Sequence, residues 1–314
     1  MNPDNLKIGP LRISTMVVTA HLGTSINLQR LLELFHERAI PLTWPSEGFL
    51  KVEYKPILNT KPNATPQEEQ KAKQRAKATE KIVIGTCSRD ELTKRKKSKN
   101  IFFNQSTLVV RREYMKSPSN NPVYKEVNIK LFKNGGIQMT GIPSDSFAKE
   151  TLTWLANELT TFSQPVLDSK PSPHRYSIQL INSDYQVNGS INRERLHEIL
   201  ISEYNLFSSF ESTIYQGCDT KYFYNESAPT DAIEGICPCG ESICAGNGDG
   251  TILGQCKEIT ISPFHTGSVI ITGARKFEQI EKAYVFINKI LLKHCNEIIK
   301  PFTEKKVEKK NKNI

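Results

Sequence analysis

Four cysteines in one short stretch have the most distinct chemistry in this sequence. Three lie in Cys237-Pro-Cys239-Gly-Glu-Ser-Ile-Cys244, and the fourth is Cys256. Thiolates this close together can supply the four ligands of a tetrahedral zinc ion, although the C-x-C-x4-C-x11-C spacing is not the common pair of C-x2-C knuckles. Zinc, free thiols and disulfides therefore all remain open, and Cys218 is an alternative to Cys256 as the fourth ligand.

The cysteine count argues against a disulfide framework. The chain has seven cysteines, an odd number, and no charged and apolar leader is recognised at its start. We therefore expect a protein that is not secreted, in which cysteines are thiols or metal ligands. Cys87 and Cys295 are expected to be packing residues. No apolar run of about 18 residues is present, so no membrane partner is expected.

No pattern in the chain predicts an enzyme. The sequence lacks a His-Glu-x-x-His motif, a Walker loop and a Gly-x-Ser-x-Gly elbow, and its six histidines are scattered. The run Gly246-Asn-Gly-Asp-Gly250 is interpreted as a loop that closes the cysteine cluster, because no predicted strand precedes it. Catalytic residues are therefore not assigned.

An internal repeat is the strongest signal for the fold. Ile129-Lys-Leu-Phe132-Lys-Asn-Gly135 continues into Thr140-Gly141, and Ile261-Ser-Pro-Phe264-His-Thr-Gly267 continues into Thr272-Gly273. In both copies a strand ends at a tight turn that contains glycine, and an alternating strand follows. A repeat of this kind predicts a duplicated fold with internal pseudo-twofold symmetry.

Matching elements surround the two copies and predict an α+β fold. Apolar residues at three- and four-residue steps predict a helix after each copy. Strands, asparagine caps, helices and second strands are predicted before each copy. In chain order these predicted elements are strands 16–20 and 177–181, caps Asn27 and Asn192, helices 28–38 and 193–204, strands 49–54 and 210–215, and helices 146–162 and 276–299.

Each half is expected to carry one long insert between its second and third strands. We predict a first repeat at 10–166 with a basic insert at 55–107, and a second repeat at 173–302 with a cysteine-rich insert at 217–255. Residues 303–314 form a basic tail. The net charge of +9 fits an anionic partner, and much of the excess lies at 94–99 and 305–312. Such runs are either solvated surface or arms that bind nucleic acid regardless of its sequence.

The repeated architecture resembles the TATA-box-binding protein family. The best-matched stretch is Phe-His-Thr-Gly-Ser-Val-Ile-Ile-Thr-Gly-Ala-Arg-Lys at 264–276, and the long inserts are most similar to versions encoded by large DNA viruses. The resemblance implies a curved antiparallel sheet, backed by helices into a saddle, that enters the minor groove of double-stranded DNA. It also implies a monomer that recruits transcription factor or RNA polymerase subunits, in a nucleus, a cytoplasmic viral factory or a virion.

Carried over residue by residue, the resemblance implies a set of DNA-binding side chains. Paired phenylalanines would wedge between base steps and kink the duplex. Threonines and central residues would face minor-groove acceptors. The implied wedges are Phe49, Phe132, Phe210 and Phe264, the implied threonines are Thr140 and Thr272, and Thr15 and Ser177 replace the central asparagines of the family.

Strand alternation indicates that the DNA-facing side is more polar than in the family. Lys130 and Asn128 are in phase with Phe132, and Glu258 is in phase with Phe264, as Glu53 is with Phe49. Carboxylates there would repel a polyanion. Two functions therefore stay open. One is an initiation factor that binds and bends A·T-rich promoter DNA, and the other is an interaction scaffold that has lost DNA binding.

Overall fold

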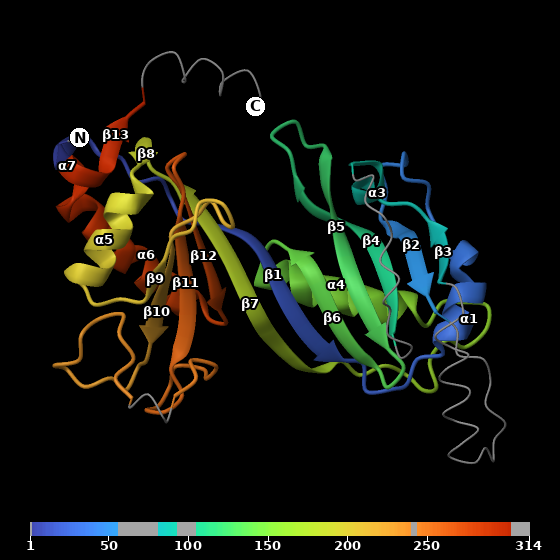
Figure 1. The fold of residues 1–314 in the computed structure, drawn as a ribbon. Helices are drawn as coiled ribbons and strands as arrows, with labels where there is room; N and C mark the ends of the chain where they lie inside the picture. The colour runs from blue at the N-terminus through green and yellow to red at the C-terminus, as the bar shows by residue number, and fades with distance from the viewer. Residues whose placement is uncertain (1, 56–80, 93–104, 240–243, 303–314) are drawn as a thin grey trace. The chain divides into compact units, whose positions relative to one another are not determined.

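The chain folds into two compact units, which Figure 1 shows as a ribbon. The computed structural model describes residues 2–55, 81–92, 105–239 and 244–302. We call Val17–Ser177 the N-unit, and Met1–Met16 together with Ile178–Ile314 the C-unit. The chain passes from one unit to the other within β1 (Arg12–His21) and β7 (His174–Gln186).

The first residues group with the second half of the chain, although the first repeat was expected to begin at residue 10. The backbone N–H of Gly9 donates to the carbonyl oxygen of Gln186 at 2.8 Å, and the N–H of Lys7 donates to Asn188 Oδ1 at 2.7 Å. Tyr284 adds a third bond by donating its hydroxyl to the carbonyl of Gly9 at 2.9 Å. The amino-terminal segment is thus fastened to the C-unit by hydrogen bonds.

The N-unit is built on an antiparallel sheet with helices on one side. Pairing is antiparallel from β3 to β2, β4, β5 and β6. The strand order is β3 (Ile82–Gly85), β2 (Gly48–Tyr54), β4 (Gln105–Lys116), β5 (Pro122–Phe132), β6 (Gly136–Ile142), β1. The helices are α1 (Leu28–Glu33), a 3-10 turn (Phe35–Glu37), α3 (Ser88–Leu92) and α4 (Asp145–Glu158).

The C-unit has a sheet of the same kind. Strands β7, β12, β11, β10 and β9 pair in that order and antiparallel. Their bounds are β12 (Ser268–Ala274), β11 (Lys257–Pro263), β10 (Asp219–Tyr224) and β9 (Ser208–Ser209). The helices are α5 (Arg193–Ser202), α6 (Phe277–Lys293) and α7 (Cys295–Ile298), with a 3-10 turn at Pro3–Asn5. A two-stranded sheet pairs β8 (Gly189–Ile191) with β13 (Ile299–Pro301).

Alternation along the strands gives each sheet one covered face and one open face. In β5 the side chains of Val127, Ile129 and Leu131 are fully buried, whereas Asn128 and Lys130 between them are half-buried. Helix α4 packs on the covered face of the N-unit, and α6 packs against β11 and β12 in the C-unit. An open face of this kind is common in antiparallel sheets. Antiparallel sheets with helices packed against them confirm the α+β fold class predicted from the sequence.

The two predicted asparagine caps are confirmed. Asn27 Oδ1 accepts a hydrogen bond from the backbone N–H of Arg30 at 2.9 Å, and Asn192 Oδ1 accepts one from that of Arg195 at 3.2 Å. Each cap satisfies an amide that has no partner inside its helix. The helix expected at 28–38 is shorter, because α1 ends at Glu33 and a 3-10 turn follows. The helix expected at 276–299 is divided at His294 into α6 and α7.

The repeat recurs in the backbone hydrogen bonds. At the two hairpin tips the N–H of Gly135 donates to the carbonyl of Phe132 at 2.8 Å, and that of Gly267 donates to Phe264 at 3.0 Å. Each glycine carbonyl then accepts from the residue that follows the unit's first strand. The N–H of Leu22 donates to the Gly135 carbonyl at 2.9 Å, and that of Val187 donates to the Gly267 carbonyl at 2.8 Å. A second matched pair joins the N–H of Ile26 to the Lys133 carbonyl at 2.9 Å and the N–H of Ile191 to the His265 carbonyl at 3.2 Å.

The two inserts do not occupy equivalent loops, so that prediction is wrong. The first lies between β2 and β4, whereas the second lies between β10 and β11, which pair as β4 and β5 do. The strand expected at 210–215 is also wrong, since residues 212–214 form a turn. The alternation of 219–224 forms that part of the sheet instead. This strand was not predicted from the sequence, because its residues fall within the cysteine-rich insert expected at 217–255.

Gly135→Ala should destabilise the N-unit strongly. Gly135 has φ +92°, and a Cβ there would overlap the carbonyl oxygen of Thr24. The left-handed conformation alone costs an L-residue about 1–2 kcal/mol, and the overlap adds to it. Gly136→Ala is the matched control, because its Cβ would meet the side-chain oxygen of Asn134 at 3.2 Å and the Phe132 side chain at an ordinary 3.6 Å, with no backbone atom in the way. Urea unfolding should show a lower midpoint for Gly135→Ala than for the control, and equal midpoints would contradict this account.

Candidate nucleic-acid interface and metal centre

The open face of the N-unit is formed by two paired strands. It consists of Asn128, Lys130 and Phe132 of β5 with Gln138 and Thr140 of β6, and all five are half-buried. Lys130 lies opposite Gln138 in the ladder, and Asn128 lies opposite Thr140. The Thr140 hydroxyl donates to the carbonyl of Asn128 at 3.4 Å, a long bond that leaves its lone pairs available. This face therefore presents hydroxyl, amide and ammonium groups beside one phenylalanine.

The open face of the C-unit carries the equivalent strands with more charge. It consists of Lys221 of β10, Glu258 and Thr260 of β11, and Thr272 of β12, which lies opposite Thr260. Lys221 Nζ lies 2.8 Å from Glu258 Oε1 and donates to Thr260 Oγ1 at 2.9 Å. The lysine, which sequence reasoning missed, thus neutralises the carboxylate that was expected to repel DNA.

The carboxylate expected on the N-unit face is neutralised as well. Lys51 Nζ lies 2.7 Å from both Glu53 Oε1 and Asp90 Oδ1, and Lys81 also pairs with Glu53. Burial alone would lower the pKa of Lys51, but hydrogen bonds to Asp90 and Glu53 raise it. Burial would likewise raise the pKa of Glu53, and hydrogen bonds from Lys51 and Lys81 lower it. Lys51 and Glu53 are therefore both ionised at neutral pH and compensate each other.

Two of the predicted wedges stand at equivalent hairpin tips. Phe132 and Phe264 are half-buried, each three residues before the glycine of its turn. The Phe264 ring meets the edge of Tyr215 at a centroid distance of 5.6 Å. Both rings are therefore partly exposed at the tips of their hairpins.

Phe49 is not an exposed wedge, and this prediction is corrected. Its side chain is 0% exposed and packs among the rings of Phe35, Trp154 and Phe162 at 5.8–6.3 Å. The cause is a register shift in β2 between Phe49 and Lys51 that breaks the alternation of its side chains. The ring therefore belongs to the core of the N-unit.

Phe210 is not the structural partner of Phe49. It follows β9 without belonging to a strand and is half-buried. The Arg193 guanidinium lies 4.9 Å from its ring centroid. A small cleft of about 190 Å³ at the start of α5 is lined by Phe210, by the basic side chains of Arg193, His265 and Lys300, and by Glu194. These basic side chains gave no signal in the sequence, because they come from three separate segments.

Of the remaining predicted contacts, Thr15 and Ser177 lie in the first strand of each repeat, and the two threonines Thr140 and Thr272 lie in the last. Thr15 is half-buried in β1, and Ser177 is exposed in β7. Thr272 is half-buried in β12, directly before Gly273 at φ +103°. Thr140 has the same position before Gly141 at φ +84°. The basic runs at 94–99 and 305–312 lie outside the described residues.

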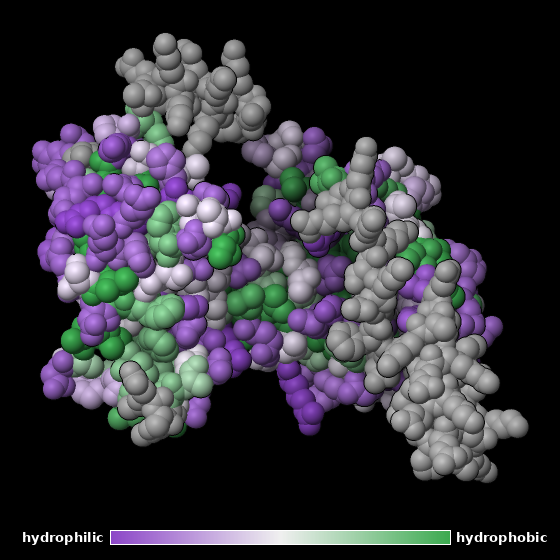
Figure 2. Space-filling view, in the orientation of Figure 1, coloured by the Kyte–Doolittle hydropathy of each residue, from purple (hydrophilic) through white to green (hydrophobic). Residues whose placement is uncertain are grey.

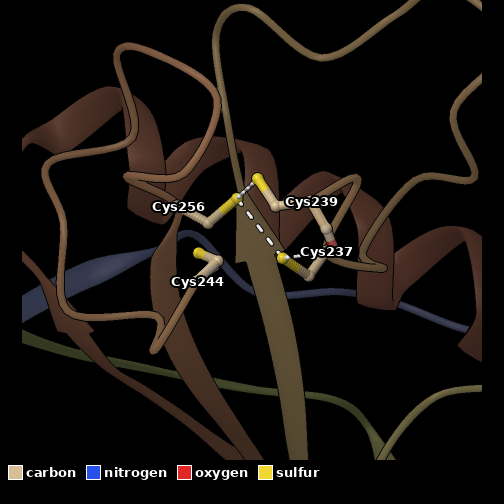
Figure 3. Close-up of side chains that lie close together, drawn as sticks. All are labelled: Cys237, Cys239, Cys244 and Cys256. Atoms are coloured by element: carbon tan, nitrogen blue, oxygen red, sulfur yellow. Dashed lines mark hydrogen bonds between the residues drawn. The ribbon is translucent and has the colours of Figure 1, made fainter. Parts of the chain in front are cut away.

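Four cysteines converge at the root of the second insert, as Figure 3 shows. The sulfurs of Cys237, Cys239, Cys244 and Cys256 all lie within 4.8 Å of one another. Cys256 Sγ is 3.6 Å from Cys237 Sγ and 3.5 Å from Cys239 Sγ. This group could hold a metal ion. Cys218 lies elsewhere, 3.4 Å from Ser208 Oγ, so the structure selects Cys256 for the cluster. Cys87 and Cys295 are buried.

The surroundings raise the pKa of one clustered thiol, Cys256, and lower the pKa of another, Cys244. Burial raises the pKa of the Cys256 thiol far above its ordinary value. Burial also acts to raise the pKa of Cys244, but hydrogen bonds from the backbone of Gly246 and Cys256 lower it overall. The N–H of Gly254 donates to Cys239 Sγ at 2.9 Å, and Asn225 Nδ2 donates to Cys256 Sγ at 3.2 Å. Such donors stabilise sulfur that carries negative charge.

Comparison with known proteins gives one informative sequence relative. A protein of Acanthamoeba polyphaga mimivirus named TATA-box-binding protein-like is 30% identical over 219 residues, which cover 66% of this chain and 52% of the relative. The chain thus spans about half the length of this curated relative. No family model matches the chain. The solved structure of Methanococcus jannaschii TBP aligns with 14% identity and a TM-score of 0.40, covering 90% of this chain and 98% of that one. None of the described helices is long and apolar enough to cross a membrane.

Replacing Phe49 should cost far more stability than replacing Phe264. Phe49→Ala removes a ring that is fully enclosed by three aromatic neighbours, a change that typically costs about 3–5 kcal/mol. Phe264→Ala removes a half-buried ring at a hairpin tip and should cost less than half as much. Chemical unfolding of the two variants, followed by circular dichroism, measures both losses. Equal losses would contradict the assignment of Phe49 to the core.

Proposed function

We propose that this divergent relative of the TATA-box-binding protein family is a transcription initiation factor that binds and bends A·T-rich duplex DNA through the minor groove. The observation that carries the proposal is the matched pair of hairpin tips. Phe132 and Phe264 stand partly exposed at equivalent turns, and each turn leads into an open strand that ends in Thr-Gly. In this proposal both units present the same device to the duplex.

In this proposal the phenylalanine wedges bend the DNA by opening base steps. Unstacking a base step costs a few kcal/mol, and an apolar side chain must fill the gap. The hairpin tips suit this task because the glycine turns and their carbonyl hydrogen bonds hold the backbone rigidly. Phe210 remains a candidate for a supporting contact, since its ring is half-buried beside Arg193.

The charges of the open faces are compatible with a polyanion. Glu53 is neutralised by Lys51 and Lys81, and Glu258 by Lys221, so neither presents an uncompensated charge. The cleft beside the Phe264 turn adds Arg193 and Lys300, two cations against the one carboxylate of Glu194, which suits a backbone phosphate. The net charge of +9 adds sequence-independent attraction.

Recognition in this proposal favours A·T pairs by hydroxyl contacts. The minor groove offers only adenine N3 and thymine O2 at such pairs, and both are acceptors. Thr272 lies on the open face of the C-unit with a hydroxyl donor, and Thr15 and Ser177 add hydroxyl donors where the family has asparagines. In this proposal the Thr140 hydroxyl exchanges its 3.4 Å bond to the Asn128 carbonyl for one to a base. A hydroxyl has one donor where an amide has two, so central readout should be weaker here.

The other parts of the proposal concern partners and cofactor. We assign the protein a non-catalytic role as a monomer that recruits transcription factor or RNA polymerase subunits, in a nucleus, a cytoplasmic viral factory or a virion. Zinc is the cofactor that we assign to Cys237, Cys239, Cys244 and Cys256, because four convergent thiolates are a typical structural zinc ligand set.

A second function is favoured by one specific observation. The insert 225–256 contains five acidic residues and no lysine or arginine, in a chain of net charge +9. It also exposes Ile233, at 64%, and Ile252, at 58%. Hydrophobic residues are visible among hydrophilic ones at the end of the C-unit where β10 stops (Figure 2). An acidic and apolar insert suits a protein partner better than DNA, so an interaction scaffold without DNA binding is the alternative.

A bending assay tests the proposed function. Energy transfer between dyes at the two ends of an A·T-rich duplex should rise when the protein binds, and a G·C duplex serves as control. Phe132→Ala and Phe264→Ala should each abolish most of the bend while keeping residual binding at low salt, because the filler of the opened base step is lost. Removing residues 305–312, which carry five lysines, should lower affinity and the salt dependence with little change in bend angle.

The same assay separates the two functions. If the unmodified protein leaves both duplexes straight at every concentration, the initiation-factor proposal fails and the scaffold alternative takes its place. If the bend survives both phenylalanine substitutions, the two hairpin tips are not the wedges.

A further inference from the structure

The described residues of the insert 225–256 form almost no apolar core of their own. Among its described residues only three glycines, Gly235, Gly246 and Gly250, and one side chain, Cys256, are buried. Ile233, Ile252 and Leu253 are more than half exposed, and Ile236 is half-buried. A segment of this length without a core needs a staple such as a metal ion or a disulfide to stay folded.

The four sulfurs lie where a metal ion or a disulfide would constrain the insert most. Asn225 directly follows β10 and Cys256 directly precedes β11, and Tyr224 pairs with Lys257 across the hairpin. The cluster is therefore at the base of the insert. Asn225 spans this base by donating one hydrogen bond to Cys256 Sγ at 3.2 Å and one to the Ile252 carbonyl at 2.8 Å.

We call arms the three segments of the insert that contain Cys237 and Cys239, that follow Cys244, and that lead to Cys256. All three arms meet at the cluster. The arm with Cys237 and Cys239 is tied to β10, because the N–H of Phe223 donates to the Gly235 carbonyl at 3.0 Å. The arm after Cys244 is tied to β11 by a 2.8 Å bond from the N–H of Glu258 to the Gly246 carbonyl. The last arm is tied to the sulfurs directly, through the N–H of Gly254.

The geometry favours a single tetrahedral ion. Zinc–sulfur bonds of about 2.3 Å place neighbouring sulfurs about 3.8 Å apart in a tetrahedron. The separations of 3.5 and 3.6 Å are close to that value, and Cys256 makes both of them. A disulfide would join two sulfurs at about 2.05 Å and leave the other two unused. Four thiolates with no carboxylate or imidazole among them select a soft, tetrahedral metal.

We propose that Cys237, Cys239, Cys244 and Cys256 hold one structural Zn²⁺ and that this ion, in place of a hydrophobic core, folds the insert 225–256 onto the β10–β11 hairpin. This inference rests on the zinc assignment made above but not on DNA binding. The insert is then a metal-dependent folding unit, and the N-unit is independent of the metal. Metal binding supplies folding free energy where the site does not exist in the unfolded segment.

Metal content and cobalt spectra of the full chain test the site itself. Protein purified without added zinc should contain about one equivalent, and Cys256→Ser should hold less than about a tenth of an equivalent. Cys218→Ser is the matched control, since Cys218 is also fully buried in the C-unit but lies outside the cluster. Replacing zinc with Co²⁺ should give the intense visible bands of tetrahedral thiolate coordination. A metal-free protein without these bands would overturn the proposal.

Hydrogen exchange read by mass spectrometry tests the folding role. Chelation of the metal should remove amide protection from 225–256 and from the adjoining ends of β10 and β11, while peptides of the N-unit keep theirs. Returning Zn²⁺ should restore the protection, and Cys218→Ser should respond as the unmodified protein does. Unchanged protection after complete chelation would overturn the folding role. The outcome is independent of the bending assay, because no DNA is present.

Discussion

The architecture depends on the two glycine turns that close the repeated hairpins. Gly135 and Gly267 take positive φ values of 92° and 80°, and a side chain at either position would overlap a neighbouring carbonyl oxygen. Their own carbonyls accept hydrogen bonds from Leu22 and Val187, the residues that follow the first strand of each repeat. One close approach of two backbones therefore fixes the hairpin tip and, with it, the place of the phenylalanine that precedes the turn.

The open faces show how a polar sheet stays compatible with an anionic partner. A carboxylate on such a face repels phosphate unless a cation lies beside it. In the C-unit Glu258 is matched by Lys221 on the next strand, and in the N-unit Glu53 is matched by two lysines. Register thus decides the local charge, because the cross-strand neighbour determines whether an acidic residue is exposed or compensated.

The inserts differ in position, and the second also lacks a core. One interrupts the chain between β2 and β4, and the other interrupts it between β10 and β11. The second insert brings four sulfurs together at its base, and among its described residues almost no other side chain is buried. Long insertions between paired strands are tolerated because the loop-closure entropy grows slowly with loop length.

The sequence by itself determined the repeat, the fold class, the asparagine caps and the family resemblance, because turns, caps and alternation are set by neighbours along the chain. It also identified three of the four clustered cysteines and narrowed the fourth to two candidates. Only the tertiary structure chose Cys256 over Cys218, buried Phe49 through a register shift, and paired Lys221 with Glu258. Each of these depends on which strand lies beside which, and a single residue of slip in register reverses the face that a side chain occupies.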